Sequence, residues 1–288
     1  MQDMTDLIHR LNQSGKRLSK GHRKIADYIV QYYDKAVFMT ASTLGESVGV
    51  SESTVVRFAS ALGYEGYPQL QRAMQELVRH RLTAAQRFEM AAELRQEEVL
   101  HTVLRTDMQN IRTTIESMDE KVFESVVARL VSARSIYVVG VRSASILASF
   151  LAYYLHYVFE NVHAPTDMSV DIFEQISRIG PEDVLVGISF PRYSSRTLEA
   201  MNFACSRGAQ VIAITDGPMS PLVDASTECL LASTDMASFV DSLAAPLSVI
   251  NALIVAVGLQ RKEELSEHFR QLEEIWQQHH IYLEREKT

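Results

Sequence analysis

The stretch that decides the fold of the larger part of the chain is DVLVGISFPRYSSRT, residues 183–197. Its first half is apolar and rich in β-branched residues, which indicates a strand buried on both faces of a parallel sheet. Its second half carries proline, arginine, tyrosine and a cluster of hydroxyls. A buried strand that leads into a loop so rich in hydrogen-bond donors predicts a ligand-binding loop.

Short apolar runs alternate with longer amphipathic ones on both sides of this stretch. We expect strands at 135–141, 161–165, 183–189, 210–215 and 228–233, with helices between them. The predicted fold is an α/β domain in which a five-stranded parallel sheet lies between two helical layers, a three-layer αβα sandwich. In the doubly wound order 2-1-3-4-5, the chain reverses direction between the first and third strands, where open sheets bind ligands.

Two loops leave the predicted reversal point, and both are rich in serine and arginine. Each loop also opens a helix, whose free N–H groups and dipole favour an anion. We therefore predict an effector site for a small anionic metabolite. The alternative is that Ser143 and Ser194 only cap their helices. The predicted effector-binding residues are Arg142, Ser143, Ser145, Ser189, Arg192, Ser194 and Ser195.

Charge divides the chain into a basic head and an acidic body. Residues 1–82 have a net charge of +3 and residues 83–288 a net charge of −11. The head shows helical periodicity without a convincing strand. An excess of basic residues in a small helical domain is typical of a nucleic-acid contact.

The run TASTLGESVGVSESTVVRFASALGY, residues 40–64, predicts a helix-turn-helix with its turn at Gly49 and its second helix capped by Ser51. In the second helix an apolar stripe faces the core and leaves Ser53 and Arg57 pointing outward, flanked by Thr54 and Ser60. An arginine and short hydroxyls suit base and phosphate contacts in the major groove. The alternative is that Arg57 belongs to an ordinary solvated surface. The predicted DNA-binding residues are Ser51, Ser53, Thr54, Arg57 and Ser60.

Composition excludes several other classes of protein. Two cysteines, and a start that lacks an apolar leader, indicate a reduced, cytoplasmic protein without a disulfide framework. The nearly charge-free run 242–259 is interrupted by proline, serine and asparagine, so we expect a buried or interfacial helix and no membrane span.

The run KIADYIVQYYDKAVFMTASTLGESVGVSESTVVRFASALGYEGYPQL resembles the N-terminal domain of RpiR-type bacterial transcriptional regulators, whose signature is matched at 51–57 and 63–67. The resemblance implies operator DNA as a partner, and a C-terminal SIS (sugar isomerase) domain that binds a phosphosugar and dimerises. Both loops depart from the SIS pattern, because Arg142 stands at a glycine position and Pro191 and Arg192 replace a Ser-Gly pair. A carboxylate ligand therefore stays open beside a phosphosugar.

The resulting organisation has four parts. Residues 1–82 form the helix-turn-helix head, 83–126 a helical connector, 127–266 the SIS domain and 267–288 a C-terminal amphipathic helix. We expect a homodimer or homotetramer on a palindromic operator. Whether the ligand relieves repression or creates activation stays open.

A sugar-phosphate isomerase is the competing function. Its general base would be a carboxylate or histidine near the second strand, with Glu160, His163 and Glu174 as candidates. No motif around them specifies catalysis, so we expect no enzyme activity. No metal site is expected, because His279 and His280 are neighbours that point to different sides of a helix. The three-glycine spacing of a dinucleotide site is missing, so no cofactor is expected.

Overall fold

The chain forms two compact units. The computed structural model describes residues 19–37, 39–79, 96–165, 170–236 and 239–283, together with 85, 87 and 88. One unit comprises residues 1–101 and 237–240, and the other comprises 102–236 and 241–288. Part of the expected connector, residues 89–95, lies outside the described residues.

The described part of the head is helical. Its core is formed by one face of each longer helix, with Ile25, Leu44 and Phe58 fully buried. The predicted stripe of the second helix, from Val55 to Leu62, is buried, which confirms the expected orientation of that helix. The helices are α2 (Lys20–Gln31), α3 (Tyr33–Ala36), α4 (Ala41–Val48), α5 (Glu52–Ala61) and α6 (Tyr67–Arg79).

Two glycines make the turn between α4 and α5. Gly49 ends α4 with φ 71°, a left-handed conformation that glycine adopts without strain. The N–H groups of Gly49 and Val50 bond to the carbonyls of Glu46 and Gly45, which satisfies the last turn of the helix. A Cβ on Gly45 would lie 2.8 Å from the Val50 carbonyl oxygen, so the turn folds closely over α4.

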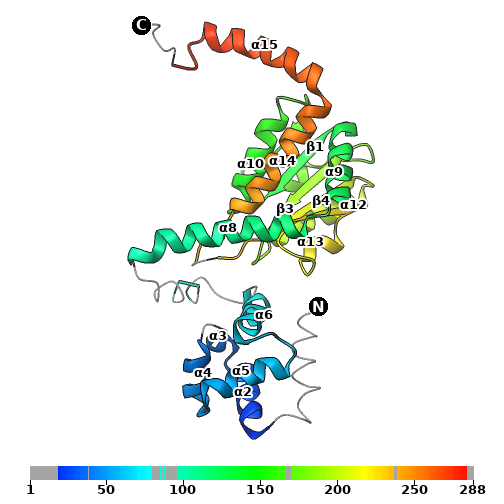
Figure 1. Ribbon diagram of the computed structural model, residues 1–288. Helices are drawn as coiled ribbons and strands as arrows, with labels where there is room; N and C mark the ends of the chain where they lie inside the picture. Colours follow the sequence, from blue (N-terminus) through cyan, green and yellow to red (C-terminus); the bar gives the residue numbers. More distant parts are fainter. Residues whose placement is uncertain are drawn as a thin grey trace, which may run out of the picture. The chain divides into compact units, whose positions relative to one another are not determined.

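The body contains the predicted five-stranded parallel sheet, of which Figure 1 labels β1, β3 and β4, and its order is the assumed doubly wound one, β2-β1-β3-β4-β5. The central strands are buried along their length, because helices cover both faces. The edge strand β2 is only two residues long, shorter than the expected 161–165. The strands are β1 (Ile136–Gly140), β2 (Val162–His163), β3 (Val184–Ile188), β4 (Gln210–Thr215) and β5 (Glu228–Leu231).

Two apolar cores, one on each face of the sheet, account for the continuous apolar strands. Along β1, Val138 belongs to one core and Val139 to the other. The first core is closed by α9 (Glu120–Ser132), α10 (Ala144–Leu155) and α14 (Ala244–Gln260). The second is closed by α11 (Ile172–Gln175), α12 (Ser195–Ser206) and α13 (Pro221–Asp224). This arrangement is the predicted three-layer sandwich.

Helix α8 (Val99–Ser117) is fixed to the segment between β5 and α14 by a buried polar contact. The side chain of Asn110, 1% exposed, donates to the Asp235 carbonyl and accepts from the Ser233 hydroxyl and the Asp235 N–H. Ser242 adds a bond of 2.6 Å to Asp107. These contacts tie sequence positions more than 120 residues apart, from Asn110 to Asp235.

Helix α15 (Lys262–Gln278) leaves α14 at a bend of 100°. Leu265 packs against Gly258, and Phe269 and Trp276 contact the Tyr157 ring. No residue of α15 is buried. Within the described residues no helix alone has the length and hydropathy of a membrane span, and α14 and α15 reach them only as a pair across this bend.

Candidate DNA-reading and effector sites

The outward face of α5 carries the polar residues predicted from the sequence. Ser51, Ser53, Arg57 and Ser60 are exposed, and Thr54 is half-buried. Ser51 occupies the N-cap position with extended backbone, but its hydroxyl makes no capping bond. It lies 3.0 Å from the Ser53 hydroxyl and 2.8 Å from that of Thr54 instead. The predicted capping bond is therefore absent, and three hydroxyls form a polar cluster at the start of the helix.

The guanidinium of Arg57 is oriented by its own helix. Its Nε donates to the Ser53 carbonyl at 3.1 Å, and one Nη lies 3.4 Å from the Thr54 hydroxyl. The other terminal nitrogen makes no hydrogen bond within the described residues. A pair of terminal donors is the geometry that guanine O6 and N7 accept in the major groove.

A second basic element, which the sequence reasoning did not single out, lies beside the start of α5. The beginning of α2 approaches this turn, because a Cβ on Gly21 would lie 3.3 Å from the Thr54 methyl group. Lys20 and Lys24, on either side of Gly21 in sequence, are exposed. A helix N-terminus with lysines next to a reading helix suits contacts to DNA phosphate. The signal was present in the sequence as the run SKGHRK, residues 19–24.

The loop after β1 holds an arginine in a strained conformation. Arg142 has φ 61°, a left-handed conformation that costs a residue with a side chain about 1 kcal/mol or more. The N–H and hydroxyl of Ser145 both bond to the Arg142 carbonyl, at 3.0 and 2.6 Å. Ser143 precedes α10 but its side chain makes no capping bond, so the capping alternative does not describe it. The Arg142 side chain and Ser143 are exposed.

The loop after β3 repeats this strain. Arg192 has φ 68° and is exposed. Ser189 is buried and its hydroxyl accepts the Ser194 N–H at 3.0 Å. Ser194 caps α12 by accepting the Thr197 N–H at 3.3 Å, as the capping alternative proposed. Ser195 is exposed at the first position of the helix.

The two loops start from adjacent positions of the sheet. Gly140, the last residue of β1, pairs with Ile188, the last residue of β3. Neighbouring parallel strands lie about 4.8 Å apart, so both loops leave the same edge side by side. No ion pair is found for Arg142 or Arg192 among the described residues. The structure thus places two strained, exposed arginines at the predicted reversal point, while Ser145, Ser189 and Ser194 are used in local hydrogen bonds.

Further polar groups at this edge were missed by the sequence reasoning. The Thr197 hydroxyl is buried and has no hydrogen-bond partner among the described residues, although the threonine stands in the quoted loop. The Tyr193 hydroxyl donates to Asp216 at 2.8 Å, just beyond β4. The Thr215 hydroxyl lies 2.8 Å from the Ser189 carbonyl oxygen. These contacts connect the ends of β3 and β4, and no periodicity in the sequence signals them.

Within the described residues, no hydrogen bond or ion pair joins the candidates for an isomerase base to these loops. Glu160 and Glu174 are exposed. His163 is also exposed and stacks on Tyr137 with ring centroids 4.7 Å apart. Within the described residues, no group of three or more histidine, cysteine, aspartate or glutamate side chains is arranged to hold a metal ion.

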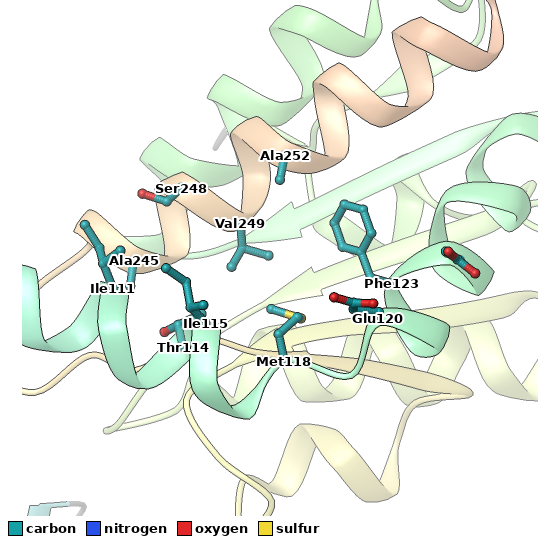
Figure 2. Close-up of a pocket in the computed structure, with 11 residues that line it drawn as sticks. Ile111, Thr114, Ile115, Met118, Glu120, Phe123, Ala245, Ser248, Val249 and Ala252 are labelled. Carbon is teal, nitrogen blue, oxygen red and sulfur yellow. The ribbon is translucent and has the colours of Figure 1, made fainter.

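An apolar groove of about 510 Å³ lies elsewhere on the body (Figure 2). It lies between α8, the start of α9 and the side of α14 that carries Ala245, Ser248, Val249 and Ala252. None of its lining residues belongs to the two arginine loops. They are Ile111, Thr114, Ile115, Met118, Glu120, Phe123, Glu124, Ala245, Ser248, Val249 and Ala252.

Two protein families match the chain. Residues 5–79 match the helix-turn-helix domain of the rpiR family, and residues 129–256 match the SIS domain. The first match contains α2 to α6, and the second contains all five strands.

Curated relatives match most of this chain and most of their own length. The HTH-type transcriptional regulator HexR of Pseudomonas aeruginosa is 26% identical over 277 residues, which cover 94% of this chain and 95% of HexR. An uncharacterized HTH-type transcriptional regulator of Escherichia coli, YfhH, is 26% identical over 77% of this chain and 79% of its own.

Solved structures show the same fold. The sugar isomerase domain of an RpiR transcription factor from Sphaerobacter thermophilus has a TM-score of 0.59 at 22% identity and covers 62% of this chain and 99% of its own. The NanR protein of Vibrio vulnificus, solved in complex with ManNAc-6P, has a TM-score of 0.57 at 22% identity and covers 94% and 97%. With an rpiR-family helix-turn-helix joined to a SIS domain, and with HTH-type regulators as its relatives, the chain belongs to the RpiR-type transcriptional regulators.

Proposed function

We propose that this regulator reads a palindromic operator through α5 and changes its DNA affinity when a small anionic metabolite binds between the β1 and β3 loops. The metabolite is a phosphosugar or a sugar acid. The regulator acts in the cytoplasm as a homodimer or homotetramer and has no isomerase activity.

The observation that carries the effector proposal is the pair of strained arginines. Left-handed backbone at two residues with long side chains persists only where the surroundings enforce it, and such strain clusters at ligand sites. Arg142 and Arg192 lie in the loops that follow the adjacent ends of β1 and β3, and their φ angles are 61° and 68°. A guanidinium group binds carboxylate or phosphate through paired bonds, and neither arginine makes an ion pair within the described residues.

The bound metabolite of NanR supports a phosphosugar, since that protein was solved with ManNAc-6P. Both arginines bind a carboxylate equally well, so sugar acids belong in the same test.

Calorimetry against a panel of sugar phosphates and sugar acids tests the effector site. We expect Arg192→Ala and Arg142→Ala each to weaken binding by tenfold or more, because each removes a charge-assisted contact of about 1.5–3 kcal/mol. Arg196→Ala is the matched control, since Arg196 lies in the first turn of α12, which follows the Arg192 loop, but pairs with Glu199. An effector bound equally by wild type and both loop variants would refute the site.

Operator binding tests the DNA proposal. Arg57→Ala should weaken specific binding by about 1–3 kcal/mol while leaving binding to random DNA nearly unchanged, because a bidentate base contact carries the discrimination. Lys24→Ala should weaken both and reduce the salt slope by about one, as expected for a phosphate contact. Equal losses on both DNAs for Arg57→Ala would make it a positioning residue only.

The isomerase alternative is tested separately. Incubation of the effector with the full chain should leave the effector unchanged by NMR. Turnover that is lost in Glu160→Gln, His163→Gln or Glu174→Gln would overturn the non-enzyme proposal.

A further inference from the structure

A cluster of buried polar groups joins α8 to the segment that follows β5. The Thr114 hydroxyl accepts the Ser233 N–H at 2.9 Å. The Asn110 side chain accepts from the Ser233 hydroxyl and the Asp235 N–H, and it donates to the Asp235 carbonyl. We call these four residues the α8 clamp. Each of these bonds connects a side chain of α8 with the segment between β5 and α14, so the clamp holds the two in one register.

Helix α8 depends on the clamp for its place on the body. Of its 19 residues only Asn110 and Thr114 are buried, and both are polar. Its apolar side does not close against α14, because the groove of about 510 Å³ lies between them (Figure 2). Hydrogen bonds are directional and apolar packing is not, so bonds fix the position of a helix along its axis more narrowly. The clamp therefore sets the position of α8.

The end of β5 is connected to the β3 loop by hydrogen bonds across three strand ends. The Ser194 N–H in that loop donates to the Ser189 hydroxyl at 3.0 Å. The Ser189 carbonyl accepts the Thr215 hydroxyl at 2.8 Å, and the Thr215 carbonyl accepts the Ala232 N–H at 2.8 Å. Ala232 directly precedes Ser233 of the clamp. An uninterrupted path of bonds therefore leads from the effector loop to α8.

Both segments that the clamp joins continue into the compact unit that contains the head. The first turn of α8, residues 99–101, belongs to that unit, while the rest of the helix belongs to the body. Residues 237–240, which follow the clamp residue Asp235, also belong to the head unit. Within that unit the Phe239 ring contacts the Phe88 ring of the connector, with centroids 5.6 Å apart. The clamp therefore joins the stretches of chain that connect the body covalently to the head unit.

We propose that the α8 clamp transmits binding of the effector to the DNA-reading head. A metabolite held by the two arginine loops fixes the β3 loop, and the bonds along the strand ends carry that change to Ser233. Because the clamp holds Ser233 and α8 in one register, both segments shift together. The metabolite then alters DNA affinity by as much as it prefers one arrangement of the clamp over the other. The proposal rests on the proposed function and adds the residues that couple its two sites.

Operator binding with and without a metabolite tests the clamp. The DNA is a duplex that the full chain selects from a randomised library. The probes are ManNAc-6P, glucose 6-phosphate and gluconate, each at a saturating concentration. For wild type we expect at least one probe to change operator affinity by about tenfold, which is an ordinary size for coupling between two sites. Calorimetry measures the affinity for the same probe in each variant.

A matched pair of substitutions on α8 separates coupling from binding. Thr114→Val keeps the shape of the side chain but cannot accept the Ser233 N–H. We expect this variant to bind the probe within about threefold of wild type, while the probe changes its operator affinity by less than about twofold. Thr113→Val is the control, because Thr113 is exposed and its hydroxyl bonds only to Gln109 on the same helix. It should respond to the probe as wild type does.

The outcomes distinguish the clamp from the proposed function. A wild type whose operator affinity no probe alters contradicts both. If wild type responds and Thr114→Val responds equally, the clamp alone is refuted, as it also is if Thr114→Val no longer binds the probe. Binding of the probe without a response supports the clamp. Circular dichroism checks folding, and Ser233→Ala, which removes one bond to Asn110, replaces Thr114→Val if that variant does not fold.

Discussion

The two helical layers of the SIS domain cover the same sheet but face the outside with different chemistry. In the layer formed by α9, α10 and α14, the helices α10 and α14 contain no Asp, Glu, Lys or Arg, and only α9 carries charged residues. The layer with α12 presents Arg196, Glu199 and Arg207 among its exposed residues. Their inner sides are equally apolar, since each closes one of the two cores. Inner surfaces are set by burial alone, whereas outer surfaces report what each layer meets outside the chain.

The layers also approach the sheet differently, at two strand glycines. A Cβ on Gly140 of β1 would lie 2.6 Å from the backbone carbonyl oxygen of Ala144 in α10. A Cβ on Gly187 of β3 would meet the Met201 side chain of α12. The contact at Gly140 is the more rigid of the two, because Gly140 meets helix backbone whereas Gly187 meets a flexible thioether side chain.

The largest expected effect tests this rigidity. Gly140→Ala should lower the free energy of unfolding by about 3 kcal/mol, because the Ala144 backbone cannot move without displacing α10. Gly187→Ala should cost only about 1 kcal/mol, since Met201 can change rotamer. Urea unfolding measures both, and Gly217→Ala is the control because nothing lies within 4 Å of its added Cβ. An equal loss of unfolding free energy in the two variants would show that the two contacts are equally rigid.

The next effect concerns the contact between α8 and the segment that connects β5 to α14. Asn110→Ala should cost about 2 kcal/mol, because the buried Asn110 side chain makes three hydrogen bonds to Ser233 and Asp235, and the variant loses all of them. Gln109→Ala is the control, since that side chain is exposed and bonds only to Thr113 on its own helix. If both variants unfold at the same urea concentration, Asn110 does not hold α8 in place.

The two cysteines differ in burial. Cys205 is exposed on α12, and Cys229 is half-buried in the edge strand β5. Burial raises the pKa of the Cys229 thiol to about 12, and the Asp216 charge adds to that shift. Burial also raises the pKa of the exposed Cys205 thiol. Only the thiolate reacts with Ellman's reagent, and a raised pKa lowers the fraction of thiolate at pH 8. We therefore expect the reagent to label Cys205 first and Cys229 at least tenfold more slowly. Labelling of Cys229 should accelerate as the pH rises toward its pKa. Single Cys→Ser variants assign the phases, and equal rates would contradict the difference in burial.

The smallest effect is expected on the charged surface. Arg196 and Glu199 form an ion pair of 3.5 Å in which both side chains are more than half exposed. Arg196→Ala should change the free energy of unfolding by less than about 0.5 kcal/mol, because water and salt screen such pairs. A loss above 1 kcal/mol in urea would show that this surface stabilises the fold as well as keeping it solvated.

Regular patterns made most of the fold predictable. The apolar run 183–189 predicted β3, and the same pattern predicted the other strands and the two helical layers, while the strand order was assumed and agrees with the structure. In the head, the stripe from Val55 to Leu62 predicted the inward side of α5. The predictions held because burial of apolar groups imposes a period on the sequence. The exception is β2, where an edge strand needs few paired residues and the pattern overstated its length.

The candidate sites were less predictable, because hydrogen-bond partners are not periodic. The sequence placed Ser51 at the start of α5, but its hydroxyl bonds to neighbouring side chains and not to the backbone. From the sequence, all the serines of the effector loops were predicted to bind the ligand. In the structure Ser189 is buried and accepts a hydrogen bond from the Ser194 N–H, whereas Ser195 is exposed. Local composition indicates that a loop is polar, and only the packed chain decides which groups are already satisfied.

By itself the sequence determined the helix-turn-helix, the parallel α/β sandwich and the two arginine-rich loops, because each depends on residues close together in the chain. Only the tertiary structure decided that Arg142 and Arg192 share a left-handed backbone at adjacent strand ends. It also decided that α8 and α14, more than a hundred residues apart, form an apolar groove between them. Both results require distant segments to meet, and that meeting follows from how the cores pack on the two faces of the sheet, not from any local pattern.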